Sequence, residues 1–289
     1  MHRLALAVAA ALAAGLAAVS LSAAAPRSPQ RALRYPQRIV SLSPTVTEDL
    51  FAIGAGKQVV AVDQDSNYPA RAPRTSLSGY TPNVEAIAAY HPDLVLISYN
   101  PGNFASQLRT LGIKVVDEPA ASNLPQAYRE ILQLGRLTGH VRGATSVVRW
   151  MRKRLAAIVR SVPGSRRHLR VYHELDPTYY SATSHTFIGS IYRLFGFRDI
   201  ADAAGKAAGT DYPQLSAEYI IQQNPQIIVL ADTKCCAQTP ATVAARPGWN
   251  TIAAVEHHRV VGVDDDVASR WGPRIVQFAQ AVARIARRG

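Results

Sequence analysis

The sequence predicts an α/β fold with two similar lobes, each built on a mostly parallel sheet, which one long helix joins around a ligand cleft. Three observations predict this fold. Short apolar runs alternate with helical patterns, the second half of the chain repeats the first, and an amphipathic segment separates the two halves. Alternation of strands with helices is typical of parallel sheets that helices cover on both faces.

Three short runs are apolar at every position and predict buried strands. They are Val59–Val62, Leu94–Ile97 and Ile227–Leu230. Runs of this length without a polar position suit strands covered on both faces, as in a parallel sheet.

Helical patterns lie between these strands. We expect the first over residues 45–53, where Thr45 and Glu48 form a T-x-x-E capping box before an apolar run. Three further helices are predicted in the first half, over residues 83–90, 104–111 and 125–137.

The second half of the chain repeats the first. Residues 84–97 align without a gap on residues 217–230, so that one glutamate and one proline recur at a constant offset. Upstream, residues 47–54 resemble residues 189–196 at a slightly different offset, as an insertion or deletion produces. A two-fold repeat of this length predicts two similar lobes.

An amphipathic segment predicts the helix that bridges the lobes. Its apolar residues recur every three or four positions, and a Pro-Gly pair ends it. The apolar stripe consists of Val148, Met151, Leu155, Ile158, Val159 and Val162. We therefore assign residues 36–137 to the N-terminal lobe, 138–163 to the bridging helix and 168–289 to the C-terminal lobe. A helical bridge restrains hinge motion, so the cleft is expected to move little.

Residues 1–25 have the pattern of a secretory signal peptide. A basic start at His2 and Arg3 precedes an apolar run, and three alanines end it, with cleavage expected after Ala25. A membrane anchor is the alternative, which an alanine-rich stretch without a charged flank fits less well. Because no cysteine lies near the cleavage site, we expect a periplasmic protein that is not a lipoprotein and has no stable membrane insertion after cleavage.

The formal net charge of +12 is concentrated in one segment. Ten Lys and Arg lie from Arg136 to Arg170, and no acidic residue lies between Glu130 and Glu174. An exported protein rarely meets nucleic acid, so we expect no nucleic-acid partner. We interpret the segment as a solvated helix face, with weak attraction to anionic lipid headgroups as the alternative.

The two cysteines of the chain, Cys235 and Cys236, are adjacent. Two thiolates are too few for a four-cysteine zinc site. A vicinal disulfide, a disulfide between chains and a reduced pair are all compatible with the sequence.

Short motifs follow one another in a defined order along the chain. They are RIVSLSP at 38–44 with TE at 47–48, NVE at 83–85 with HPDLV at 91–95, LGIKV at 111–115, SAE at 216–218 with NP at 224–225, and RPGW at 246–249. In order and spacing they resemble the helical-backbone class of periplasmic binding proteins of ABC importers, which serve vitamin B12, haem and ferric siderophores. The resemblance covers residues 38–286. It implies a receptor that performs no chemistry, needs no cofactor or metal of its own and delivers a metal chelate to an importer.

The resemblance also implies contacts with the importer's permease subunits. In this family one glutamate at the tip of each lobe docks onto permease arginines, and the matching residues are Glu85 and Glu218. Two exposed carboxylates, one per lobe, would give a bivalent grip. The alternative is that each carboxylate stabilises the positive end of its own helix.

The ligand is expected in the cleft, on loops at the carboxyl ends of the strands. Loop tyrosines suit a large flat ligand with a polar rim, such as a corrinoid, a haem or another ferric chelate. The predicted ligand-binding tyrosines are Tyr68, Tyr80, Tyr99, Tyr179 and Tyr212. By the resemblance, Asp266 and Arg270 match an Asp and an Arg that contact the ligand in B12-binding members.

The choice among these ligands is left open by the sequence. Tryptophans of the B12-binding members are replaced by tyrosines or by small residues such as Gly79 and Ser98, so a ferric siderophore and haem follow cobalamin as candidates. A tyrosine or a histidine could ligate haem iron. His173 and His185 are near the predicted cleft, although a lone histidine is more often structural.

Two other functional classes compete with the receptor. A periplasmic enzyme could use the carboxylates Glu174, Asp176 and Asp266 as an acid–base set, but the chain carries no recognised catalytic motif. A receptor for free zinc or manganese would need three histidines and a carboxylate in the cleft, and the eight histidines are scattered.

Overall fold

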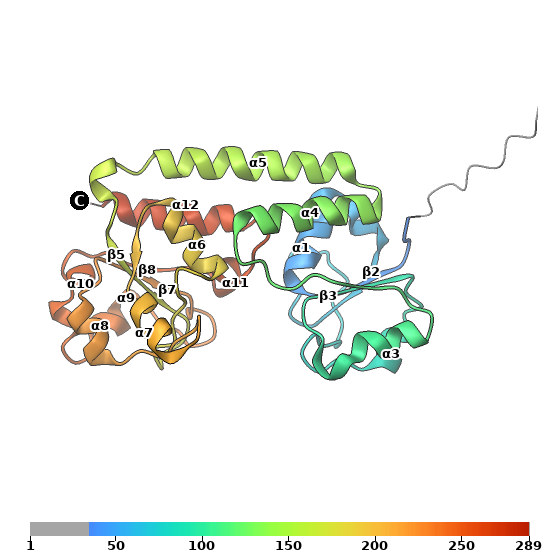
Figure 1. The fold of residues 1–289 in the computed structure, drawn as a ribbon, viewed down its shortest axis with the longest axis horizontal. Coiled ribbons are helices and arrows are strands. Elements are labelled where there is room, and N and C mark those ends of the chain that lie inside the picture. Colours follow the sequence, from blue (N-terminus) through green and yellow to red (C-terminus); the bar gives the residue numbers. More distant parts are fainter. Residues whose placement is uncertain (1–34, 289) are drawn as a thin grey trace, which may run out of the picture. The chain divides into compact units, whose positions relative to one another are not determined.

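Two four-stranded parallel sheets, one in each lobe, form the frame of the computed structural model, which describes residues 35–288. The long helix α5 (Val141–Arg160) runs past both sheets (Figure 1). The predicted two-lobed α/β fold is confirmed. Within the described residues, no helix combines the length and the apolarity needed to cross a membrane. The predicted signal peptide lies outside the described residues.

The two sheets have the same strand order, which confirms the internal repeat. The first has the order β2-β1-β3-β4 and the second the order β6-β5-β7-β8, so each lobe places its first strand second in the sheet. The strands are β1 (Ile39–Leu42), β2 (Val59–Val62), β3 (Leu94–Ile97), β4 (Val115–Asp117), β5 (Arg170–Glu174), β6 (Arg198–Asp199), β7 (Ile227–Leu230) and β8 (Val260–Gly262). All three strands predicted from apolar runs are present with the predicted bounds.

Helices connect the strands in both lobes. The first lobe contains α1 (Pro44–Ile53), α2 (Val84–Ala88), α3 (Phe104–Thr110) and α4 (Leu124–Thr138). The second contains α6 (Phe187–Leu194), α7 (Ala201–Ala208), α8 (Ala217–Gln223), α9 (Pro240–Ala244), α10 (Ala253–Glu256), α11 (Asp265–Ser269) and α12 (Ile275–Arg287). Each helix predicted in the first half is present, although α2 is shorter than expected.

Alternate residues of the apolar strands pack into different cores, which explains why these strands have no polar position. In β3, Leu94 and Leu96 face a core that α1, α4, α5, α6 and α12 share, whereas Val95 and Ile97 face a small core under α2 and α3. In β7, Ile227 faces the shared core, whereas Ile228 faces a third core in the second lobe. The shared core is continuous from one lobe to the other, so hinge motion would have to disturb close-packed side chains.

The bridging helix begins at Val141, three residues later than predicted. Gly139 ends α4 in a left-handed conformation with φ 82°, and its N–H bonds to the carbonyl of Gly135. Glycine adopts this conformation without the steric cost that a Cβ brings. The predicted apolar stripe is buried, apart from Val159, which is partly buried. Its last member, Val162, lies beyond the end of α5, because the helix ends at Arg160 and not at residue 163 as predicted.

The predicted capping box at the start of α1 is wrong. Helix α1 begins at Pro44, and the side chain of Ser43 caps it by accepting a hydrogen bond from the N–H of Val46 at 3.5 Å. Proline at the first helical position loses no hydrogen bond, because that N–H has no partner inside a helix. Glu48 instead turns away from the helix end toward two arginines of the other lobe.

A pair of equivalent arginines shows how closely the lobes repeat. The guanidinium of Arg38 donates hydrogen bonds to the carbonyls of Tyr90 and His91. That of Arg170 donates to the carbonyls of Gln223 and Asn224 at the matching turn. His91 and Asn224 both have positive φ, 47° and 46°. Each arginine therefore holds a left-handed turn against the amino end of its sheet.

Candidate ligand-binding site

A cavity of about 550 Å³ lies at the carboxyl ends of β1, β2 and β3 and reaches the α11 segment of the second lobe. Four of the predicted ligand residues line it: Tyr80, Tyr99, Asp266 and Arg270. Parallel strands place their carboxyl-end loops together, which is why residues distant in sequence meet here. The volume is in the range of small-molecule sites.

Tyr80 and Tyr99 form an aromatic wall of this cavity. Their side chains are 71% and 56% exposed, and their ring centroids lie 6.2 Å apart at an interplanar angle of 48°. An aromatic ring offers a large apolar face to a ligand, and each of these rings also carries a phenol for a polar contact. The two tyrosines can therefore cover the face of a flat ligand and bond its rim.

The structure places the other three predicted tyrosines outside this cavity. Tyr68 packs under the guanidinium of Arg274, 4.4 Å from ring centroid to Cζ. Tyr179 stacks on Trp249 within the second lobe, with centroids 5.7 Å apart. Tyr212 is half-exposed on the segment before α8. For these tyrosines, ligand contact stays a prediction without support from this cavity.

Arg270 joins the two lobes at one end of the cavity. Its guanidinium donates to Glu48 Oε1 at 2.7 Å, to Asn67 Oδ1 at 2.9 Å, to the carbonyl of Asp65 at 2.9 Å and to Asp266 Oδ1 at 2.8 Å. The side chain is 8% exposed. Since the planar fork of arginine holds its partners in a fixed geometry, this residue is preorganised before any ligand arrives.

Arg274 completes a buried ion triad with Glu48 and Arg270. It donates to Glu48 Oε2 at 2.8 Å and to Oε1 at 2.5 Å. The side chain of Glu48 is only 2% exposed, so two cations from the second lobe surround one carboxylate of the first. This triad links the lobes where α1 meets the segment that precedes α12.

Asp266 lies between the cavity and a loop that contains the two cysteines. Lys234 Nζ bonds Asp266 Oδ2 at 2.8 Å and Asp264 Oδ2 at 2.7 Å. Burial alone would raise the pKa of Asp266, but hydrogen bonds from Lys234 and Asn67 and the charge of Arg270 lower it below its usual value. Asp266 therefore presents a carboxylate, not a carboxylic acid, beside the cavity.

The adjacent cysteines form a vicinal disulfide in the structure. The backbone N–H groups of Lys234 and Cys235 both donate to the carboxylate of Asp265, at 3.0–3.1 Å. The hydroxyl of Thr233 donates to the same carboxylate at 2.9 Å. The disulfide loop is thus tied to the start of α11, the helix that carries Asp266.

Sequence reasoning missed a buried carboxyl group in the cavity. Asp63 follows β2 directly, is 1% exposed and lines the cavity, and its Oδ1 has no hydrogen-bond partner. Burial raises the pKa of Asp63 to about 6. Its position after a predicted strand was the signal that could have identified it. A Cβ added to Gly79 would meet the carbonyl oxygen of Leu42 at 2.5 Å, so this wall requires glycine.

Glu85 and Glu218 occupy equivalent exposed positions in the two lobes. Each is the second residue of its helix, α2 or α8, and neither forms an ion pair within residues 35–288. Asn83 and Ser216 cap the two helices by accepting from the N–H of the helix's third residue, at 2.8 and 3.1 Å. The side chains of Glu85 and Glu218 are therefore not the caps of their helices, and both carboxylates are exposed to solvent.

The histidines considered for iron do not meet in the cavity. His173 lies in β5 with no exposed surface, and its Nδ1 is 2.6 Å from the hydroxyl of Tyr192. Burial lowers the pKa of His173 to about 3, so the ring is neutral. Its role is structural. His185 lies at a separate surface depression beside α7.

The three carboxylates that a periplasmic enzyme could use, Glu174, Asp176 and Asp266, each have separate partners in the structure. Glu174 is fully buried and forms a bidentate pair with Arg246, with both contacts at 2.6 Å. Asp176 accepts from the N–H and the hydroxyl of Thr178 in a turn. Asp266 belongs to the cavity described above, so these three side chains form no acid–base set. Within residues 35–288, no group of three or more His, Cys, Asp or Glu is placed to hold a metal ion.

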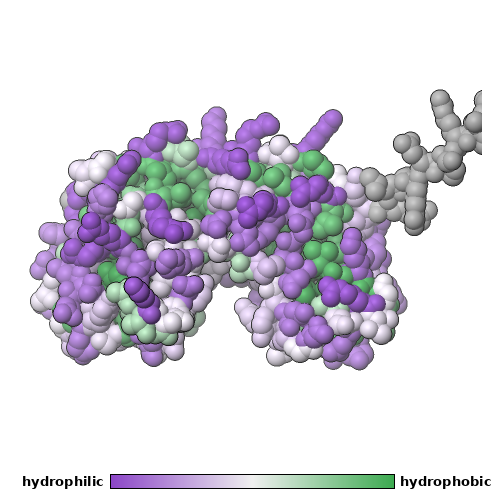
Figure 2. Space-filling model, viewed as in Figure 1, coloured by the Kyte–Doolittle hydropathy of each residue, from purple (hydrophilic) through white to green (hydrophobic). Residues whose placement is uncertain are grey.

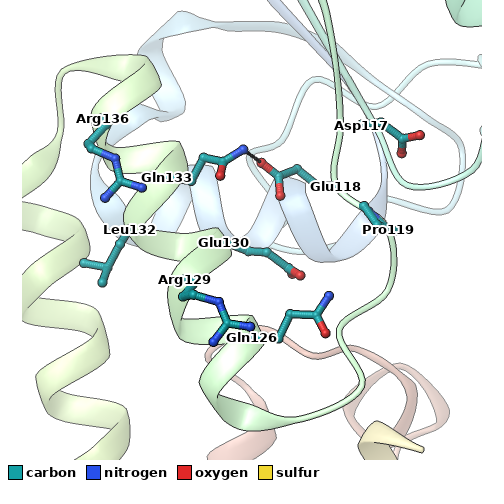
Figure 3. Close-up of a pocket in the computed structure, with 9 residues that line it drawn as sticks. All are labelled: Asp117, Glu118, Pro119, Gln126, Arg129, Glu130, Leu132, Gln133 and Arg136. Atoms are coloured by element: carbon teal, nitrogen blue, oxygen red, sulfur yellow. Dashed lines mark hydrogen bonds between the residues drawn. The ribbon is translucent and has the colours of Figure 1, made fainter.

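A second cavity of about 430 Å³ lies between the end of β4 and α4 (Figure 3). Gln133 donates to Glu118 Oε1 at 2.7 Å, and the nearby Glu130 is 7% exposed. Burial and the neighbouring Glu130 raise the pKa of Glu118 to about 7. The pKa values of Glu130 and Asp49 are also raised, in both cases mainly by burial.

We expect these carboxyls to make the protein less stable as the pH rises. Folding raises the pKa of Glu118, so the native state binds more protons than the unfolded chain between about pH 4.5 and 7, and stability falls across that window. In Glu118→Gln, the decrease in unfolding free energy from pH 5 to 8 should shrink by on the order of 2 kcal/mol. Denaturant unfolding at several pH values measures it. Glu256→Gln, which removes an exposed carboxylate from α10, is the control, and equal pH slopes in wild type and Glu118→Gln would contradict the prediction.

Residues 39–267 match the periplasmic binding protein family. A cobalamin-binding protein of Halobacterium salinarum is 34% identical over 250 residues, which cover 84% of this chain and 67% of the relative. The uncharacterized ABC transporter substrate-binding lipoprotein YvrC of Bacillus subtilis is 30% identical over 259 residues, which cover 86% of this chain and 80% of the relative.

Solved structures of periplasmic binding proteins have the same fold as this chain. The periplasmic heme-binding protein HutB of Vibrio cholerae superimposes with a TM-score of 0.76 at 23% identity, over 87% of this chain and 99% of the other. The family match covers both sheets, the bridging helix and the cavity segment up to α11. The chain is therefore a member of the periplasmic binding protein family.

Proposed function

We propose that the protein captures a metal-chelate nutrient, cobalamin first among the candidates, and delivers it to the permease of an ABC importer. The observation that carries the proposal is the cavity between Tyr80 and Tyr99 on one side and the Asp266–Arg270 pair on the other. Aromatic faces and a charged pair at its edge suit a large planar ligand with polar substituents.

The order of the ligands rests on separate observations. Cobalamin comes first because a relative that is 34% identical over 250 residues is a cobalamin-binding protein. A ferric siderophore and haem come next, because the exposed phenols of Tyr80 and Tyr99 suit ferric iron or a porphyrin face. We further propose that the leader of residues 1–25 exports the chain and that the mature protein is free in the periplasm.

Delivery would use one carboxylate on each lobe. Glu85 and Glu218 are exposed and equivalently placed, so a permease with two cationic sites at the matching separation would recognise both lobes together. In this proposal the protein contributes affinity and recognition, and no bond of the ligand changes.

Visible absorbance titrations with cyanocobalamin, haemin and a ferric siderophore test the ligand. We expect saturable binding of one of them and a loss of affinity of about 30-fold in the double variant Tyr80→Ala and Tyr99→Ala, a loss typical of truncated hot-spot aromatics. Asp266→Ala and Arg270→Ala should weaken the same ligand. Leu111→Ala is the control, because Leu111 is 58% exposed and lies outside the cavity. Failure of all three ligands to bind would overturn the proposed ligand class.

A further inference from the structure

The outer face of the bridging helix carries a row of cations. Arg142, Arg149, Lys153 and Arg160 are all exposed and are spaced by seven, four and seven residues. At 3.6 residues per turn these positions form one line along the helix, roughly 27 Å long. We call these four residues the basic stripe. Figure 2 shows the hydrophilic side chains that project from the α5 edge of the molecule.

The basic stripe has no anionic partner within the described residues. Residues 35–288 contain no ion pair to any of its four members. The three neighbouring helices α4, α5 and α12 hold ten Lys and Arg but a single acidic residue, Glu130, which is buried. Arg149 and Lys153 lie one turn apart, and like charges at this spacing destabilise a helix, so this pair costs stability.

Apolar groups lie beside the stripe. Trp150 is 48% exposed on α5, next to the cations. A groove of about 380 Å³ runs between α4, α5 and α6, with Leu155 and Leu194 on its walls and Arg160 at its edge. Tryptophan favours the boundary between lipid headgroups and acyl chains, and arginine favours the phosphates above it.

We propose that the outer face of α5 binds an anionic phospholipid surface. A straight row of cations can contact a flat layer of phosphates along its whole length, and each such residue adds attraction that falls off within a Debye length. Trp150 and the groove supply the apolar contact. In Figure 1, α5 lies along one edge of the molecule, and the notch in Figure 2 opens at the opposite edge. Binding through α5 therefore leaves the notch between the lobes open.

Cosedimentation with lipid vesicles tests this proposal independently of any ligand. We expect the purified protein to bind vesicles of phosphatidylcholine with about 30% phosphatidylglycerol at least 10-fold better than pure phosphatidylcholine vesicles, with the excess lost in about 0.5 M salt. The stripe variant, with Arg142→Gln, Arg149→Gln, Lys153→Gln and Arg160→Gln, should lose at least 10-fold of this binding.

A charge-matched control separates the stripe from general basicity. The variant with Arg74→Gln, Lys114→Gln, Arg198→Gln and Lys206→Gln removes four exposed cations elsewhere and should keep vesicle binding within about 2-fold. Circular dichroism and thermal unfolding confirm that both variants are folded. Equal binding of the wild type to anionic and neutral vesicles, or equal losses in both variants, would overturn the proposal.

Discussion

Glu48→Ala is expected to lower the free energy of unfolding by about 3–5 kcal/mol, because it leaves two nearly buried arginines without their shared carboxylate. The side chains of Arg270 and Arg274 are 8% and 13% exposed, so solvent compensates poorly for the lost carboxylate. Chemical denaturation of the purified protein measures the change.

Matched variants make the Glu48 prediction specific. Glu256→Ala removes an exposed carboxylate from α10 and should change stability by less than about 0.5 kcal/mol. Arg270 keeps its ion pair with Asp266 in Glu48→Ala, whereas Arg274 loses its carboxylate partner. Adding Arg274→Met to Glu48→Ala removes this unpaired charge and should restore part of the loss. A Glu48→Ala protein as stable as the Glu256→Ala control would show that the triad does not hold the lobes together.

Loss of both lobe-tip glutamates is expected to reduce transport about 100-fold while ligand affinity stays unchanged. In Glu85→Ala plus Glu218→Ala both carboxylates of the proposed bivalent contact are absent, whereas each single variant keeps one and should lose about 10-fold. Both side chains are exposed, so folding should be preserved. Uptake of labelled ligand by cells that depend on this receptor measures transport, and an absorbance titration measures affinity.

The transport experiment needs a control with the same charge change. Asp117→Ala plus Glu256→Ala also removes two exposed carboxylates, but from sites outside α2 and α8. We expect transport close to wild type in this variant. Wild-type uptake by the Glu85 and Glu218 double variant would refute the docking role, and reduced uptake in both double variants would point to net charge instead of docking.

Local patterns were sufficient to predict most of the elements. The apolar runs marked β2, β3 and β7 with their observed bounds, because a strand covered on both faces has no position for a polar residue. The aligned repeat predicted two lobes, and the sheets share one strand order. The start of α1 was mispredicted, since a T-x-x-E pattern is local whereas the partners of Glu48 are more than 200 residues away.

The sequence by itself determined the two-lobed α/β fold, the bridging helix and the equivalent glutamates of α2 and α8, because periodicity and internal repetition are properties of neighbouring residues. Only the tertiary structure decided which tyrosines line the cavity, that Asp63 is buried in it, and that Arg270 joins the lobes through Glu48. The physical reason is that burial and ion pairing depend on side chains brought together from both lobes, whose distances no local pattern encodes.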